Sequence, residues 1–157
     1  MAYAALNQKG EKYYTCLPKL FDVIENAQLQ YNWLITGCEC NVSNRIEEEC
    51  CAQGYCWISG VELTSIVRSN DIQWIWGILA GFEKDIPLSK VLEYPRPDID
   101  RNDIWQAPLT MQHPLSTIEI VAHDSSCTLF FSTDADMVSK FRTGYPLSED
   151  FADYLAK

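Results

Sequence analysis

The chain has few basic residues. Lys and Arg total 12 against 22 Asp and Glu, so the formal net charge is −10. A nucleic-acid-binding surface needs clustered Lys and Arg to neutralise phosphates, and an anionic membrane surface attracts the same residues. We therefore expect neither nucleic acid nor a membrane as partner. An acidic surface can attract a basic protein, although net negative charge also serves solubility alone.

Signals for export and for membrane insertion are also missing. Residues 1–12 lack a basic start followed by a long apolar stretch. The longest apolar run, Ile72 to Phe82, is interrupted by Gln73 and is shorter than the roughly 20 residues needed to span a bilayer. We therefore expect a cytoplasmic protein.

Motifs of the common enzyme classes are absent. The chain has no Gly-rich phosphate loop, no G-x-S-x-G and no H-E-x-x-H. Its two histidines are His113, in a proline-rich segment, and His123, which is expected to face Cys127 across a hairpin. Such a pair could form a thiolate and an imidazolium, but a nucleophilic site also needs an orienting group and oxyanion donors. We expect a protein that is not an enzyme and needs no cofactor.

Length and hydrophobic content indicate one folded domain. The chain has 157 residues, of which 47% are hydrophobic. We predict an α+β domain with a mostly antiparallel sheet of about five strands and helices packed on it, and residues 1–15 irregular or in a short edge strand. The predicted strands are 31–37, 55–58, 72–82, 117–123 and 127–132; the predicted helices are 17–29, one capped by Ser59 and Glu62, one after Pro87, one capped by Thr133 and Asp136, and one capped by Ser148.

The segment from Ile72 to Phe82 is predicted to be a central strand. Alternation places Ile75 and Leu79 on one side. Both sides are apolar, as expected of a strand that is covered on both faces. The other side carries Ile72, Trp74, Trp76, Ile78, Ala80 and Phe82.

Seven cysteines raise a second possibility. Their number is odd and no export signal is present, so reduced thiols are expected. Four thiolates can hold zinc, but a C-x-C and an adjacent C-C do not match the usual ligand spacing. A metal-binding or redox-sensing domain remains the alternative hypothesis, with a cluster of Cys38, Cys40, Cys50, Cys51 and Cys56.

Two predicted loops carry most of the candidate binding residues. The first, residues 38–54, is acidic, and the second, residues 95–116, places Trp105 among carboxylates. An aromatic side chain surrounded by charges is typical of an interface anchor with a polar rim. Asp98 and Asp100 could also bind calcium, although the glycine and distal glutamate of an EF-hand are missing. The predicted partner-binding residues are Glu47, Glu48, Glu49, Trp57, Asp98, Asp100, Asp103 and Trp105.

Four segments resemble a known group of proteins. They are YNWLITG (31–37), IQWIWGILAGF (72–82), HPLSTIEIVAHDSS (113–126) and YPLSEDFADYL (145–155). In overall character residues 17–157 resemble the small cytosolic immunity proteins of bacterial polymorphic-toxin and contact-dependent growth inhibition systems. The resemblance implies an acidic α+β protein that binds and neutralises a cognate toxin domain, often a basic nuclease. It transfers no role to any single residue.

Overall fold

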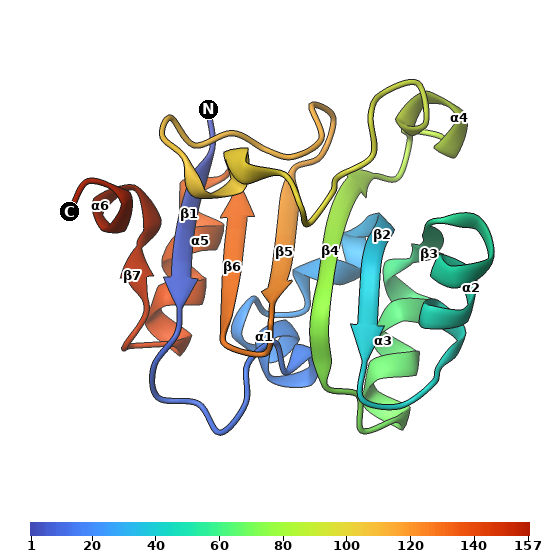
Figure 1. The fold of residues 1–157 in the computed structure, drawn as a ribbon, viewed down its shortest axis with the longest axis horizontal. Coiled ribbons are helices and arrows are strands. Elements are labelled where there is room, and N and C mark those ends of the chain that lie inside the picture. The colour runs from blue at the N-terminus through green and yellow to red at the C-terminus, as the bar shows by residue number, and fades with distance from the viewer.

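One antiparallel sheet forms the frame of the molecule. The computed structural model describes residues 1–157, and its strands lie in the order β3-β2-β4-β5-β6-β1-β7 (Figure 1). The antiparallel α+β class is as predicted, but the sheet has seven strands rather than about five. The strands are β1 (Tyr3–Asn7), β2 (Tyr31–Cys40), β3 (Cys56–Ser59), β4 (Trp74–Glu83), β5 (Ile118–His123), β6 (Cys127–Ser132) and β7 (Glu149–Asp150).

The two additional strands come from the ends of the chain. Residues 3–7, which lie in the segment predicted to be irregular or at an edge, form β1 between β6 and β7. The pairing of Tyr3 with Ser132 joins positions far apart in the sequence, so no local pattern indicates it. Strand β7 has only two residues, which is too short to show alternation.

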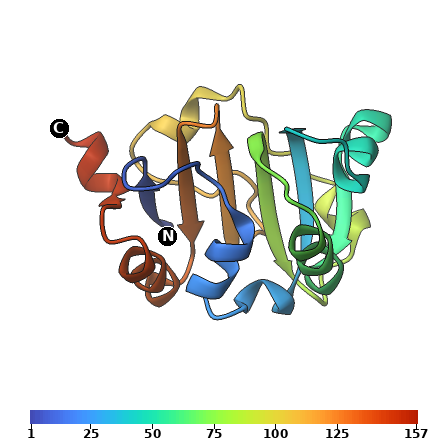
Figure 2. The same cartoon turned by 90° about the horizontal axis from the view of Figure 1, so that it is seen from below.

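Most of the helices cover one face of the sheet, and an irregular segment together with the C-terminal helix, Phe151–Leu155, covers the other. Figure 2 shows α1, α3 and α5 on one side and the segment between β4 and β5 on the opposite side. We call residues 84–117 the covering segment; it contains α4 and η2. No helix is both long enough and apolar enough to cross a membrane. The helices are α1 (Leu17–Val23), η1 (Ala27–Gln30), α2 (Arg45–Gln53), α3 (Gly60–Ser69), α4 (Leu88–Val91), η2 (Asn102–Trp105), α5 (Ala135–Gly144) and α6 (Phe151–Leu155).

Apolar side chains fill both sides of the sheet. The larger core lies under the helices, where the Phe130 and Phe141 rings stack at 4.7 Å. Two smaller cores lie on the opposite side, one around Ile78, Phe131 and Phe151 and the other around Leu34, Ala80 and Phe82. The central position predicted for β4 is confirmed, because it pairs with β2 and β5.

The predicted side of Ile72 and Trp74 is wrong, because both lie in the larger core. Trp74 lies in the larger core with Leu79, whereas Ile78, Ala80 and Phe82 face the covering segment. The pairing of β2 with β4 shifts register on both sides of Glu39, and each irregularity changes which way the following side chains point. Strict alternation therefore fails at this end of the strand.

The first predicted loop is mostly regular structure. Strand β2 extends to Cys40, and α2 occupies residues 45–53 of the segment predicted to be irregular. The Asn44 side chain caps the helix by accepting from the Glu47 N–H at 3.0 Å, and Gly54 ends it with φ +86°. Both are standard helix termini.

Other helix boundaries differ from their predicted caps. The Ser59 hydroxyl accepts from the Glu62 N–H as predicted, but the Glu62 carboxylate pairs with Arg45. Asp134 caps α5 in place of Thr133, and Asp150 caps α6 in place of Ser148. The helix predicted for residues 17–29 stops at Val23, because left-handed residues at 25 and 26 interrupt it before η1.

A buried carboxylate in β5 anchors the covering segment. Glu119 is fully buried and accepts hydrogen bonds from the backbone N–H groups of Gln112 at 2.7 Å and His113 at 3.0 Å. Burial raises the pKa of Glu119 to about 7. Ser116 Oγ lies 2.5 Å from Glu119 Oε2 and 2.9 Å from the His113 carbonyl oxygen. One hydroxyl proton cannot serve both oxygens, so a protonated Glu119 that donates to Ser116 satisfies both contacts.

Two further side chains hold the same segment. The buried His113 ring lies 2.9 Å from the Val91 carbonyl through Nε2 and accepts from the Leu115 N–H through Nδ1. These contacts fit a neutral ring that donates from Nε2, and burial lowers the pKa of His113 accordingly. In β2, the Thr36 hydroxyl donates to the Pro97 carbonyl at 2.9 Å.

The Glu119 carboxyl predicts a specific pH dependence. Because its folded pKa is raised, its contribution to stability is full below its ordinary pKa of about 4.5 and is lost as the pH rises toward about 7. Between about pH 4 and about pH 8 the free energy of unfolding should fall by about 3 kcal/mol relative to Glu119→Gln, which does not titrate. Urea unfolding across this range measures the difference, and a pH-independent difference would contradict the assignment.

Removing the Thr36 hydroxyl should loosen the covering segment. In Thr36→Val the buried Pro97 carbonyl loses its donor, which should cost about 1–2 kcal/mol of unfolding free energy. Thr143→Val is the matched control, since its hydroxyl bonds an exposed helix carbonyl, and we expect a loss below about 0.5 kcal/mol there. Urea unfolding and amide exchange at Asp100 report the effect; equal losses would exclude a special role for Thr36.

Candidate functional site

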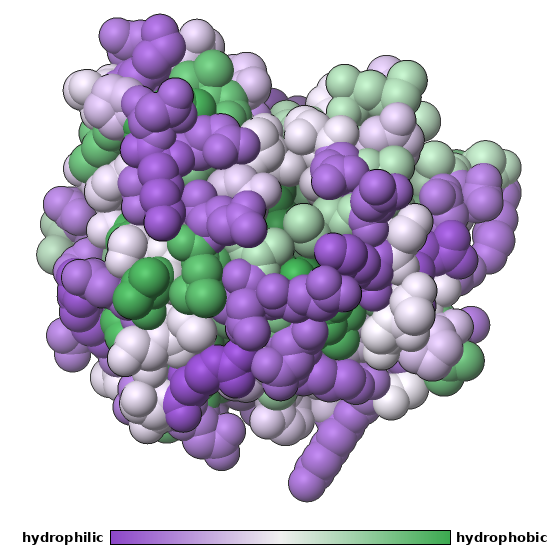
Figure 3. All heavy atoms as spheres, turned by 180° about the vertical axis from the view of Figure 1, so that it is seen from behind, coloured by the Kyte–Doolittle hydropathy of each residue, from purple (hydrophilic) through white to green (hydrophobic).

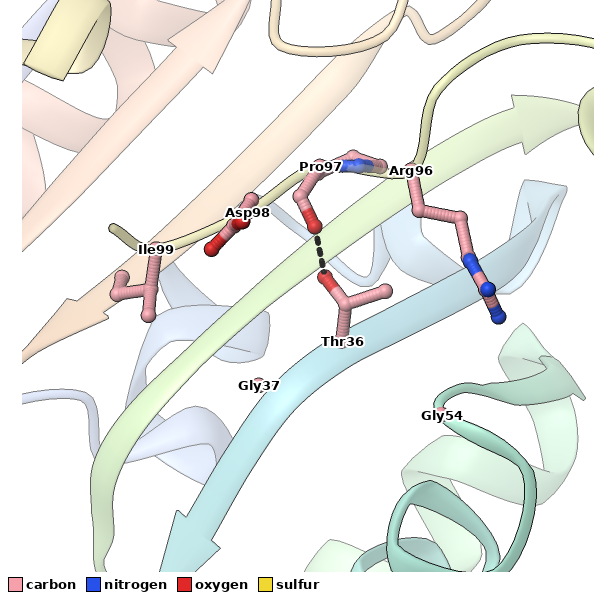
Figure 4. Close-up of a pocket in the computed structure, with 7 residues that line it drawn as sticks. All are labelled: Thr36, Gly37, Gly54, Arg96, Pro97, Asp98 and Ile99. Carbon is pink, nitrogen blue, oxygen red and sulfur yellow. Dashed lines mark hydrogen bonds between the residues drawn. The ribbon is translucent and has the colours of Figure 1, made fainter. Parts of the chain in front are cut away.

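The covering segment, β2 and the turn after α2 enclose a groove on the surface. Figure 4 shows its first part, a hollow of about 400 Å³. A neighbouring hollow of about 510 Å³ shares Arg96 with it. We call the two together the Arg96 groove, and its lining is Thr36, Gly37, Gly54, Tyr55, Leu92, Tyr94, Pro95, Arg96, Pro97, Asp98 and Ile99.

Arg96 divides the groove and has no carboxylate partner. Its guanidinium lies 5.4 Å from the centre of the Tyr55 ring, and Nη1 lies 3.4 Å from the Gln53 carbonyl oxygen. That carbonyl belongs to the end of α2, where the helix dipole favours a cation. Gly54 allows this approach, since a Cβ there would lie 3.2 Å from Nη1 and its φ is left-handed. Arg96 is therefore oriented, yet exposed.

The three predicted glutamates have different environments. The Glu47 carboxylate accepts from the Cys40 N–H at 2.6 Å. Glu49 pairs with Arg45 at 3.1 Å and accepts from the Cys56 thiol. Glu48 is exposed, and its carboxylate accepts no hydrogen bond and forms no ion pair, so it is the only one of the three carboxylates without a partner.

The aspartates of the covering segment also differ in whether they have a cationic partner. Asp103 pairs with Arg101. Asp98 lines the groove and caps a turn by accepting from the Asp100 N–H, but neither Asp98 nor Asp100 has a cationic partner. We call Glu48, Asp98 and Asp100 the free carboxylates.

The two predicted tryptophan anchors are partly structural. Trp57 is half-buried and packs on Phe82, with ring centres 5.9 Å apart. Trp105 is half-buried and contacts Phe151 at 5.5 Å and His123 at 5.2 Å. Both rings cover apolar side chains on the same face of the sheet, but in separate clusters. The structure therefore does not bring them together as one anchor.

The cysteines of the alternative hypothesis form a smaller cluster than predicted. Cys51 is exposed and Cys56 donates to Glu49, which leaves Cys38, Cys40 and Cys50 close together. No group of three or more His, Cys, Asp or Glu side chains is placed to hold a metal ion. The geometry therefore favours thiol chemistry over metal binding for this cluster.

The histidines and Cys127 do not form a catalytic arrangement. His123 and Cys127 are paired across the hairpin as expected, but the His123 ring packs between Trp76, at 4.8 Å, and Trp105. Cys127 is buried, and burial raises its pKa, so the thiol stays protonated. His113 lies elsewhere, with both ring nitrogens engaged. None of the three lines the Arg96 groove.

Sequence reasoning did not identify Arg96, Tyr55 or Tyr94. Their proximity depends on the path of the covering segment back across the sheet, which no local pattern encodes. One signal was present, because Arg96 stands between Pro95 and Pro97. Proline on both sides limits the backbone and presents the intervening side chain.

Comparisons with known proteins give no relative from which to transfer a role. No protein-family model matches the chain, and no curated protein and no solved structure matches it. The assignment of function therefore rests on the residues and the geometry described above.

Proposed function

We propose that this protein binds a basic protein domain through the Arg96 groove and the free carboxylates, and that binding neutralises the partner. Small immunity proteins act on toxin domains in this way, and a basic nuclease domain is the partner class that the charge fits. The observation that carries the proposal is the concave surface that Tyr55, Tyr94 and Arg96 line, with the unpaired carboxylate of Asp98 in its wall.

The charge distribution supports fast capture of a cationic partner. The chain carries a net charge of −10, and ion pairs leave Glu48, Asp98 and Asp100 unneutralised. Unpaired charges at an interface rim accelerate association more than they slow dissociation. The opposite, helical face in Figure 3 is mostly hydrophilic, with hydrophobic residues in small separate groups and no broad apolar patch.

The groove supplies side-chain types that dominate binding energy. Tyr55, Tyr94 and Arg96 line it, and tyrosine and arginine are enriched among the residues whose truncation weakens interfaces most. Leu92 adds an exposed apolar contact, with 39% of its surface accessible. A partner that fills both hollows would bury these side chains, and the complex would therefore dissociate slowly.

The charge part of the proposal is tested by neutralising the free carboxylates. The variant Glu48→Gln, Asp98→Asn, Asp100→Asn should bind the purified basic domain encoded by the neighbouring reading frame with an association rate about tenfold lower at low salt. The dissociation rate should change little. Surface plasmon resonance measures both rates, and inhibition of the domain's nuclease activity reports neutralisation.

A matched variant removes the same charge elsewhere. Asp71, Asp136 and Asp153 are exposed, and their carboxylates accept no hydrogen bond and form no ion pair. Changing these three to Asn should leave association within about twofold of wild type. Equal slowing by both variants would show a general effect of net charge, and absence of any binding or inhibition would refute the proposed function.

Arg96 tests the groove independently of acidic charge. Arg96→Ala should raise the dissociation rate about 10- to 30-fold, because a central arginine is lost from the interface. Arg142→Ala is the control, an exposed arginine on α5 without an ion pair. Unfolding in urea should be similar for the two variants. Unchanged dissociation in Arg96→Ala would place the interface outside the groove.

A further inference from the structure

Two thiols lie in contact at the end of β2. Cys38 Sγ and Cys40 Sγ are 3.6 Å apart, and both side chains are half-buried against the larger core. This is close to van der Waals contact for two sulfur atoms. Cys38 is also within hydrogen-bonding reach of Cys50, whose thiol donates to the Ile35 carbonyl at 3.4 Å.

The local backbone explains why the two thiols meet. Residues two apart in a strand point to the same side and are separated by about 6.6 Å along it. A disulfide needs Cα atoms about 4.4–6.8 Å apart, so a regular strand lies at the upper limit. Here Gly37 is left-handed, with φ +61°, and the pairing with β4 is irregular on both sides of Glu39. The Glu47 carboxylate further holds the Cys40 N–H.

We propose that Cys38 and Cys40 are a redox-active pair that closes to a disulfide on reaction with hydrogen peroxide and reopens on reduction by thiols. The inference does not depend on the proposed partner. It assigns the redox-sensing part of the alternative hypothesis to two specific residues and leaves Cys51 and Cys56 outside the pair.

The two thiols have different roles in this reaction. The hydrogen bond from Cys38 lowers the pKa of Cys40, and a second bond from Asn44 acts in the same direction, against burial and the nearby Glu47. The pKa of Cys38 is raised, first by its hydrogen bonds to Cys40 and Cys50 and then by burial. Because the thiolate is the nucleophile, Cys40 attacks and Cys38 resolves.

The chemistry balances in two steps. The Cys40 thiolate attacks one peroxide oxygen; an S–O bond forms, the O–O bond breaks, and hydroxide leaves. Cys38 sulfur then attacks the Cys40 sulfur; the S–S bond forms, the S–O bond breaks, and the second hydroxide takes the Cys38 proton. In total two thiols and one peroxide give one disulfide and two waters. The sulfurs together lose two electrons and the peroxide gains them.

Cys50 also contacts Cys38, and that hydrogen bond lowers the pKa of Cys50 as well, but Cys50 is buried and less accessible to peroxide than the half-buried Cys40. The thiols outside this cluster lack the arrangement. Cys51 is exposed, but no hydrogen bond joins it to another thiol. Burial raises the pKa of Cys56, and its thiol donates to the Glu49 carboxylate. Cys127 is buried with a raised pKa. Selective loss of two of the seven thiols is therefore expected at low peroxide.

Peptide mapping tests the pair directly on the wild-type protein. Reduced protein is treated with hydrogen peroxide, alkylated and digested with trypsin. Cleavage after Lys19 and Arg45 yields a peptide, Leu20–Arg45, whose only cysteines are Cys38 and Cys40, while Cys50, Cys51 and Cys56 share the next peptide, Ile46–Arg68. We expect the first peptide to lack two hydrogen atoms and to carry no alkyl group, and dithiothreitol before alkylation to restore both sites.

Other products would overturn the inference. A cross-link between the two peptides would assign the bond to Cys50 or a neighbour, and full alkylation of Leu20–Arg45 would show an unreactive pair. In Cys38→Ser the hydroxyl can still donate a hydrogen bond to Cys40 but cannot form a disulfide, so a sulfenic acid should accumulate on Cys40 and be trapped by dimedone. Cys51→Ser should oxidise like wild type. No dimedone adduct in Cys38→Ser, or loss of the disulfide in Cys51→Ser, would contradict the assigned roles.

Discussion

The hydrogen bonds between Glu119 and the covering segment are the contact on which the functional surface depends. Both faces of the sheet are apolar; most helices pack on one of them, and the other is covered by α6 and by the covering segment, which has little regular structure. Such chain has backbone N–H groups that need partners. A buried carboxyl supplies two acceptors and one proton at the point where the segment returns to β5. With this end fixed at Glu119 and the middle at Thr36, the residues around Arg96 hold their place over β2.

Pairing within the molecule determines which charges remain for a partner. Seven ion pairs engage seven of the 22 acidic residues, and several of the predicted binding carboxylates are among those that serve the fold. Glu47 holds β2 and Glu49 holds Arg45 and Cys56, so acidity along α2 is partly structural. Counting carboxylates therefore overstates the charge that is available to a partner, because those engaged within the fold are already paired.

The sequence predicts what local patterning encodes. The hairpin of β5 and β6 and the central strand β4 follow from alternation and from apolar character on both faces. The place of β1 in the sheet was not predictable, because its pairing with β6 joins residues that are far apart in the sequence. Helix α2 was hidden because its cysteines and glutamates resemble a polar loop, although Asn44 and Gly54 mark its ends. At the candidate site, Asp98 was among the residues predicted from the sequence, whereas Arg96 was missed because its position beside Tyr55 and Gly54 arises only from the tertiary fold.

At the end of β2, the residues of the Arg96 groove and the thiol pair lie on opposite faces of the sheet. Thr36 faces the covering segment and the Arg96 groove, while Cys38 and Cys40 pack against the larger core on the helical side. Between them Gly37 and the register irregularity turn the strand, so neighbouring residues serve opposite faces. Glu47, near the start of α2, binds the Cys40 N–H, whereas Gly54, after the end of the same helix, lines the groove. A disulfide of Cys38 and Cys40 closes within one strand and adds no link to α2. The proposed partner binding and the proposed thiol oxidation therefore involve opposite faces of the same strand.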